Sequence, residues 1–129
     1  MRPGFGSNII PTAESMKYAQ QLGVVDIVPS TEHLPSINGT WALHDLVNLR
    51  RNVENYGMKV SALENVPIEF YDHIMLNGPR RDEQLDNMIT TIRNIARAGI
   101  PIFGYHWMPS MVWRTPTKLI RGGAVATAF

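Results

Sequence analysis

Apolar residues recur with a helical period in three stretches of the chain, and a glycine follows each stretch. We predict helices over residues 12–22, over residues 41–56, and from an N-cap at Asp82 to Gly99. Thr12 suits the N-cap of the first helix, and a glycine at the C′ position is a common helix ending. The inward positions predicted from spacing are Met16, Ala19 and Leu22 in the first helix, Leu43, Leu46, Val47, Val53 and Tyr56 in the second, and Leu85, Met88, Ile89, Ile92, Ile95 and Ala96 in the third.

A short apolar run follows each of these glycines, at residues 24–28, 58–63 and 100–103, and a weaker strand candidate lies at residues 1–6. Unbroken apolar runs of this length are typical of parallel strands that are covered on both faces. Strands that alternate with helices in this order predict a parallel sheet with right-handed crossovers. Asn38-Gly39 is predicted to be a turn.

Two architectures fit this alternation. An open doubly wound sheet closes its core within 129 residues, whereas a complete (β/α)₈ barrel needs roughly 250 residues. The chain lacks the glycine-rich phosphate loop of many open-sheet nucleotide-binding folds. The pattern alone leaves both architectures open. Residues 118–129 are either a hairpin that turns at Gly122-Gly123 or a frayed end.

The composition limits which classes of partner and which cellular compartment we expect for this chain. A hydrophobic content of 44% is that of a globular protein, and a net charge of +1 does not favour nucleic acid as a partner. No apolar run approaches the roughly 20 residues that cross a bilayer, and the first residues lack the apolar core of a signal peptide. Cysteine is absent, which excludes disulfides and thiolate ligands from this chain. We therefore expect a cytoplasmic protein with no nucleic-acid or membrane partner.

Polar and aromatic residues gather after the last predicted strand, as Tyr105-His106-Trp107 and then Trp113-Arg114. Enzymes built on parallel strands carry their chemistry at the carboxyl ends of those strands. The planar guanidinium of Arg114 can hold a carboxylate through two parallel hydrogen bonds, although a lone arginine is also a common surface charge. This cluster predicts a site for a polar, anionic small molecule. Trp113 is either part of that site, packing an apolar face of the ligand, or part of the core.

Two more candidates follow the earlier strands. Glu64 ends the second clear strand, and because an unpaired buried carboxylate is costly, it faces either the site or a basic partner. His33 follows the first strand. His106 is the candidate for proton transfer or for a hydrogen bond to a substrate hydroxyl, and Tyr105 is expected to pack in the core. His33 and His106 without carboxylates at ligand spacing do not make a metal site, so we predict none in this chain.

Three segments carry a family resemblance. They are Ala62-Leu63-Glu64-Asn65-Val66-Pro67-Ile68, then Tyr105-His106-Trp107-Met108-Pro109 with Trp113-Arg114-Thr115, and His33-Leu34-Pro35 with Trp41. Taken in chain order, they resemble segments of mannonate dehydratase, a lyase on a xylose-isomerase-like (β/α)₈ barrel. The resemblance covers residues 24–129.

The resemblance implies that residues 1–129 are the N-terminal part, about half, of a (β/α)₈ TIM barrel, in one incomplete domain with about four strands and three helices. It implies dehydration of D-mannonate to 2-dehydro-3-deoxy-D-gluconate with Mn²⁺ or Fe²⁺, whose ligands are not present in this chain. This chain alone is then expected to be inactive. The implied substrate-binding residues are Arg114, His106, Glu64, Trp113 and His33; the catalytic residue is unknown, with His106 as the candidate. A homo-oligomer is compatible with this interpretation. The alternatives are a sugar isomerase or epimerase of the same barrel superfamily and a non-enzymatic, small, open α/β binding domain.

Overall fold

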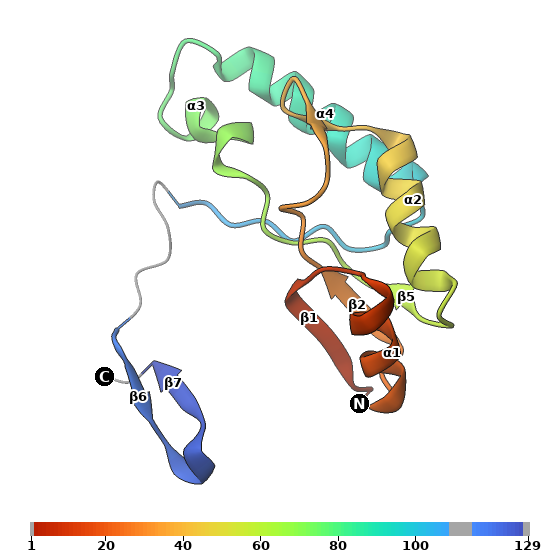
Figure 1. Cartoon of the computed structure of the whole chain (residues 1–129). Helices are drawn as coiled ribbons and strands as arrows, with labels where there is room; N and C mark the ends of the chain where they lie inside the picture. Colours follow the sequence, from red (N-terminus) through yellow and green to blue (C-terminus); the bar gives the residue numbers. More distant parts are fainter. Residues whose placement is uncertain (1, 109–114, 128–129) are drawn as a thin grey trace.

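The computed structural model describes residues 2–108 and 115–127, and three parallel strands form its main sheet (Figure 1). These are β1 (Gly4–Ile9), β2 (Asp26–Pro29) and β5 (Lys59–Val60), in the spatial order β1-β2-β5. A parallel bridge between Leu63 and Phe103 adds the next segment on the far side of β5. Spatial order therefore follows chain order. This winding is that of a barrel, because a doubly wound sheet reverses direction at a switch point.

Helices alternate with these strands, which confirms the α/β class. Between β1 and β2 lies α1 (Ala13–Gln21), and between β2 and β5 lies α2 (Leu43–Glu54). Two short elements, η1 (Ile68–Phe70) and α3 (Asp72–Met75), precede the long helix α4 (Arg81–Arg97). The remaining elements are β3 (Ser36–Ile37), β4 (Thr40–Trp41), β6 (Thr117–Leu119), η2 (Arg121–Gly123) and β7 (Val125–Thr127).

The two faces of the sheet differ in polarity. Across the strands Phe5 pairs with Ile27 and Ile27 with Val60, and both Ile27 and Val60 are buried. One residue earlier, Asp26 pairs with Lys59, and successive side chains of a strand point to opposite faces. The core on the apolar side collects Met16 and Ala19 from α1, Leu46 and Val53 from α2, and Ile95 from α4.

Asp26 ties the three strands together on the polar face. Its carboxylate lies 3.0 Å from Nε of Arg2 and 3.3 Å from Nζ of Lys59, and it accepts a hydrogen bond from the Ser61 hydroxyl. The Ser61 hydrogen bond, with the two nearby cations, holds the pKa of Asp26 below its ordinary value. The polar face is thus organised around one carboxylate.

The predicted cap of the first helix is confirmed, and one of its inward positions is wrong. The Thr12 hydroxyl accepts the Ser15 N–H, and the Ser15 hydroxyl accepts the Thr12 N–H, which makes a capping box. Met16 and Ala19 are buried as predicted. Leu22 is 53% exposed, because the helix ends at Gln21 and Leu22 lies in the turn that leads to Gly23.

The second helix begins two residues later than predicted. Trp41 belongs to β4, which pairs antiparallel with β3 around the Asn38-Gly39 turn. Both turn residues have positive φ, at 51° and 74°, as a tight hairpin turn requires. The Trp41 ring is buried against Phe70, with ring centroids 5.4 Å apart. The hairpin thus supplies the aromatic residue that the periodicity had assigned to the helix.

The predicted apolar stripe of the third helix is also partly wrong. The fully buried side chains of α4 are Gln84, Thr91 and Ile95, whereas Ile89 and Ile92 are 45% and 46% exposed. Ala96 is exposed, and the N-cap is Arg80 rather than Asp82. Polar contacts set the rotation of α4 about its axis. Gln84 makes hydrogen bonds to the segment before the helix, and Nδ2 of Asn94 donates to the Trp41 carbonyl at 2.9 Å.

The tail forms an antiparallel hairpin of β6 and β7. The Ile120 N–H donates to the Ala124 carbonyl at 2.8 Å, so the reversal is longer than the two-residue turn predicted. Gly122 and Gly123 both have positive φ, at 76° and 77°. Within residues 2–108 and 115–127, no helix is long and apolar enough to cross a membrane.

Candidate functional site

The carboxyl ends of the strands bring three loops to one edge of the sheet. A parallel bridge joins Ser30, just after β2, to Glu64, and the next bridge joins Leu63 to Phe103. The Gly104 N–H donates to the Leu63 carbonyl at 2.7 Å. The loops that start at residues 30, 64 and 104 therefore lie side by side at the edge where barrel enzymes build their sites.

Glu64 is held at this edge by close backbone packing. The buried Thr31 hydroxyl donates to the carbonyl of Asn65 and, at 3.3 Å, to that of Glu64. A Cβ on Gly104 would lie 3.2 Å from Cβ of Glu64, so a side chain there would displace Glu64. Within the described residues, no hydrogen bond or ion pair engages the Glu64 carboxylate. The structural ion pair, one of the two predicted alternatives, is thus not seen there.

His106 and Trp107 pack on a tyrosine that the sequence analysis did not select. Tyr71 is 1% exposed and stacks on Trp107, with ring centroids 5.3 Å apart and planes 20° apart. The half-buried His106 ring meets Tyr71 edge-on at 6.0 Å. The Tyr71 hydroxyl donates a long hydrogen bond of 3.4 Å to the Met108 carbonyl. Burial raises the pKa of Tyr71 above its ordinary value.

Tyr105 corrects one prediction. It was expected to pack in the core, but its side chain is 75% exposed. The predicted strand over residues 100–103 makes its bridge at Phe103, and residues 104–108 form no regular strand. Strict alternation therefore ends before Tyr105. The tyrosine that packs inward is Tyr71, from the preceding loop.

Gln84 fixes the loop that carries Tyr71. Its Nε2 donates to the Glu69 carbonyl at 2.9 Å and to Oδ1 of Asp72 at 2.6 Å, and its Oε1 accepts the Ile74 N–H at 3.1 Å. The Gln84 hydrogen bond is the main cause that lowers the pKa of Asp72. Gln84 was not among the predicted inward positions of this helix because its side chain is polar. Its helical spacing from Thr91 and Ile95 was the signal that could have placed it on the buried face.

His33 is exposed in the loop after β2. The neighbouring Thr31 links that loop to the Glu64 loop, but in residues 2–108 no hydrogen bond joins His33 to Glu64 or His106. Arg114 and Trp113 lie outside the described residues. The structure thus brings Glu64 beside the segment that carries His106 and puts His33 on the adjoining loop.

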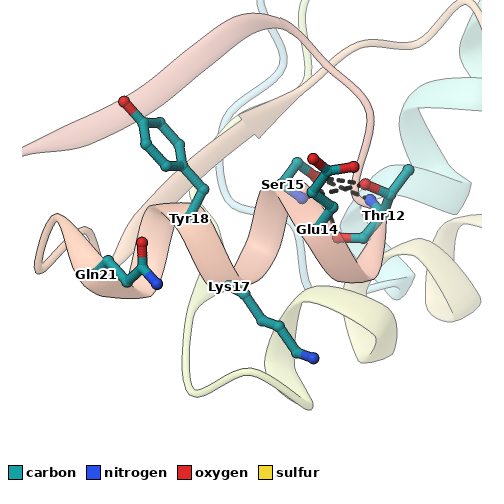
Figure 2. A pocket seen from close by; sticks show the side chains of 6 residues that line it. All are labelled: Thr12, Glu14, Ser15, Lys17, Tyr18 and Gln21. Carbon is teal, nitrogen blue, oxygen red and sulfur yellow. Dashed lines mark hydrogen bonds between the residues drawn. The ribbon is translucent and has the colours of Figure 1, made fainter.

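No group of three or more His, Cys, Asp or Glu side chains that could hold a metal ion occurs in residues 2–108 and 115–127. Two surface hollows lie elsewhere. Figure 2 shows the hollow along α1, in which the lining side chains point in different directions rather than toward a common point. The residues that line it are Thr12, Glu14, Ser15, Lys17, Tyr18 and Gln21. The other adjoins Asp26, and its charges are already paired, as Arg2 and Lys59 with Asp26 and as Arg50 with Glu54.

Several known proteins that are similar to this chain come from one family. Residues 5–129 match the family model of D-mannonate dehydratase (UxuA). Mannonate dehydratase of Streptococcus equi subsp. zooepidemicus is 34% identical over 91 residues, which is 70% of this chain and 24% of that protein. The protein of the same name from Geobacillus thermodenitrificans is 32% identical over 100 residues, 77% of this chain and 26% of that protein. The aligned part of the chain thus spans about a quarter of the length of these relatives.

A solved structure extends the likeness to the whole chain. The crystal structure of mannonate dehydratase from Streptococcus suis serotype 2 superposes with a TM-score of 0.83 and 26% identity. The match covers 100% of this chain and 37% of that one. It confirms the predicted fold class, a part of a barrel in which parallel strands alternate with helices. On the family model and on this structural match together, the chain belongs to the D-mannonate dehydratase (UxuA) family.

Proposed function

We propose that this chain supplies the substrate-binding edge of a mannonate dehydratase, a hydro-lyase that acts on a six-carbon sugar acid. The observation that carries the proposal is the family match over residues 5–129, together with a sheet edge at which Glu64 lies beside the segment that carries His106. The proposed reaction is the dehydration of D-mannonate to 2-dehydro-3-deoxy-D-gluconate, and the proposed setting is hexuronate breakdown.

The dehydration reaction determines which groups the carboxyl edge of the sheet has to provide. Dehydration removes the proton α to a carboxylate and expels a hydroxyl group, so negative charge develops on that carboxylate. We place Arg114 opposite the substrate carboxylate because of its place in the family motif. Its planar guanidinium would offer a fork of hydrogen-bond donors. His106 would hydrogen-bond or protonate a substrate hydroxyl, and the Glu64 carboxylate would accept from another. Trp113 and His33 would complete the substrate contacts.

The family resemblance adds a metal to this proposal. Mn²⁺ or Fe²⁺ would stabilise the developing charge in the complete enzyme. Because the described residues contain no group of ligands that fits such an ion, we propose that its ligands come from outside residues 1–129, and we derive no step through it.

A binding comparison tests the substrate class. D-Mannonate and the uncharged polyol D-mannitol share their carbon skeleton but differ in the carboxylate. We expect nuclear magnetic resonance titration of the 129-residue chain to show weak binding of D-mannonate at His106 and Trp107 and much weaker binding of D-mannitol. The Arg114→Ala variant should lose this preference. Tighter binding of an uncharged aldose than of D-mannonate would instead favour a sugar isomerase.

A further inference from the structure

Tyr71 connects two loops at the carboxyl edge of the sheet. It lies between η1 and α3 in the loop that follows Glu64, and its partners lie in the segment that follows Phe103. One side chain makes all three contacts: the stack on Trp107, the edge-on contact with His106 and the hydrogen bond to the Met108 carbonyl. Three consecutive residues of the second loop therefore depend on a residue of the first.

Tyr71 is itself rigidly held. Its ring is almost completely buried, its N–H donates to the Ile68 carbonyl at 3.0 Å, and its carbonyl accepts the Met75 N–H at 2.9 Å. Gln84 bonds the residues on both sides of it, at Glu69 and Asp72. A chain of contacts thus runs from α4 through the Tyr71 loop to the segment that carries His106.

Trp107 remains 51% exposed although it is stacked on Tyr71. The stack on Tyr71 thus leaves about half of the Trp107 residue accessible at the carboxyl edge. An accessible aromatic ring beside a hydrogen-bonding imidazole suits a sugar acid, which presents both apolar C–H groups and hydroxyls. Holding such groups in one geometry lowers the entropic cost of binding.

We propose that Tyr71 is a positioning residue that sets His106 and Trp107 for contact with a sugar acid, with Trp107 as the stacking surface. This inference rests on the proposed function for its ligand, and on the contacts of Tyr71 with His106, Trp107 and Met108 for its mechanism. Tyr71 itself need not touch the ligand. Its effect passes through the two residues that it holds.

Two variants of Tyr71 and one control separate its contributions. Tyr71→Phe keeps the ring contacts and loses the hydrogen bond to Met108, whereas Tyr71→Leu loses both. The control is Tyr105→Phe, which removes an exposed hydroxyl from the same segment. The measurements are the D-mannonate dissociation constant of the 129-residue chain and the chemical shifts of the His106 ring and Trp107 indole protons, which report the ring current of Tyr71.

We expect Tyr71→Phe to weaken D-mannonate binding by about twofold to fivefold, since the lost hydrogen bond is long. Tyr71→Leu should weaken it by roughly tenfold or more and move the His106 and Trp107 signals toward solvent-exposed values. Tyr105→Phe should change neither. Partial rescue by Phe relative to Leu is the signature of ring positioning.

Unchanged His106 and Trp107 signals in a folded Tyr71→Leu chain would overturn the positioning role. If that variant does not fold, the same signals in Tyr71→Phe, displaced no further than in Tyr105→Phe while D-mannonate binding also stays unchanged, would overturn it. A wild-type chain that does not bind D-mannonate, but whose signals still move in the Tyr71 variants, would refute the proposed function and the sugar-acid role while leaving the aromatic contact in place.

Discussion

Glu64 shows how a single glycine shapes the site at the scale of residues. The loop after Phe103 can approach Glu64 because residue 104 has no side chain, and a Cβ there would lie 3.2 Å from Cβ of Glu64 and 3.4 Å from the Leu63 carbonyl oxygen. Contacts of this length require the neighbour to move by a few tenths of an ångström. The Glu64 carboxylate position therefore depends on Gly104.

Substituting Gly104 should disturb the site more than the fold. We expect Gly104→Val to weaken D-mannonate binding by displacing Glu64, with Gly104→Ala intermediate. Gly4→Ala is the matched control, because its Cβ would make only ordinary contacts of 3.6 Å, with the Asp26 carbonyl oxygen. Calorimetric titration of the three variants compares their affinities. Gly104→Val binding as tightly as Gly4→Ala would show that the Glu64 position does not matter.

Residue types alone carried the sequence analysis to Glu64 and His106, because a carboxylate and an imidazole after apolar strands stand out. They did not lead to Tyr71, since an isolated tyrosine in a loop has no distinguishing pattern. Its importance lies in contacts 35 and more residues away along the chain, to His106, Trp107 and Met108. Pairings between distant loops depend on tertiary packing, which local periodicity does not encode.

At the scale of elements, helix α4 shows that polar contacts can decide which face of a helix is buried, against the spacing of its apolar residues. The sequence favours Ile89 and Ile92 as inward positions, yet Gln84 and Thr91 take the buried face. The helix existed where predicted, and so did the glycine that follows it at Gly99. Its rotation could not be read from the sequence, because it is set by hydrogen bonds of Gln84 to a loop ten to fifteen residues upstream.

Removing the Gln84 side chain should therefore destabilise the chain. Gln84→Ala leaves the Ile74 N–H and the Glu69 carbonyl without their partner in a partly buried place. We expect a loss of about 1–3 kcal/mol in the free energy of unfolding, measured by urea denaturation. Asn87→Ala removes an exposed hydrogen bond from the same helix and should cost only about 0.5 kcal/mol. Equal losses in both variants would contradict a special role for Gln84.

The contacts of Asp26 with Arg2, Lys59 and Ser61 predict that the stability of the fold depends on pH. Because the pKa of Asp26 is lowered in the folded chain below its ordinary 3.8, its ionised form stabilises the fold above that pH. This contribution should be lost as pH falls through the lower, folded pKa. Asp26→Asn should thus be less stable than wild type near neutral pH, and the difference should shrink below about pH 4.

Urea midpoints measured from about pH 6 to about pH 2 would follow this difference. Asp86→Asn is the control, since Asp86 is exposed on α4 and makes no ion pair within the described residues. A gap between Asp26→Asn and wild type that stays constant, or widens, as the pH falls would contradict the role assigned to Asp26.

At the scale of the whole molecule, the sheet has two unpaired edges within the described residues. One is β1 and the other is the segment around Phe103. Ile102 and Val25 are exposed beside this sheet, whereas Ile27 and Val60 are buried in the core that the helices cover. Unpaired edges and exposed apolar residues favour association with other chains.

We therefore expect the 129-residue chain to self-associate in solution. Size-exclusion chromatography with light scattering should show oligomers whose population rises with concentration. Ile102→Lys, at the exposed edge, should reduce association more than Leu76→Lys, at an exposed position on the loop after α3. A monomer at every concentration, with a single sharp melting transition, would contradict this expectation.

The central claim is that this chain provides the substrate-binding edge of a mannonate dehydratase, and a hybrid enzyme tests it most directly. The matching segment of the Streptococcus suis mannonate dehydratase, to which this chain superposes over its full length, would be replaced by residues 1–129. We predict that the Mn²⁺-loaded hybrid forms 2-dehydro-3-deoxy-D-gluconate from D-mannonate. Arg114→Ala should lower kcat/KM by an amount equivalent to about 2–4 kcal/mol. A folded, metal-bound hybrid that forms no product would contradict the claim.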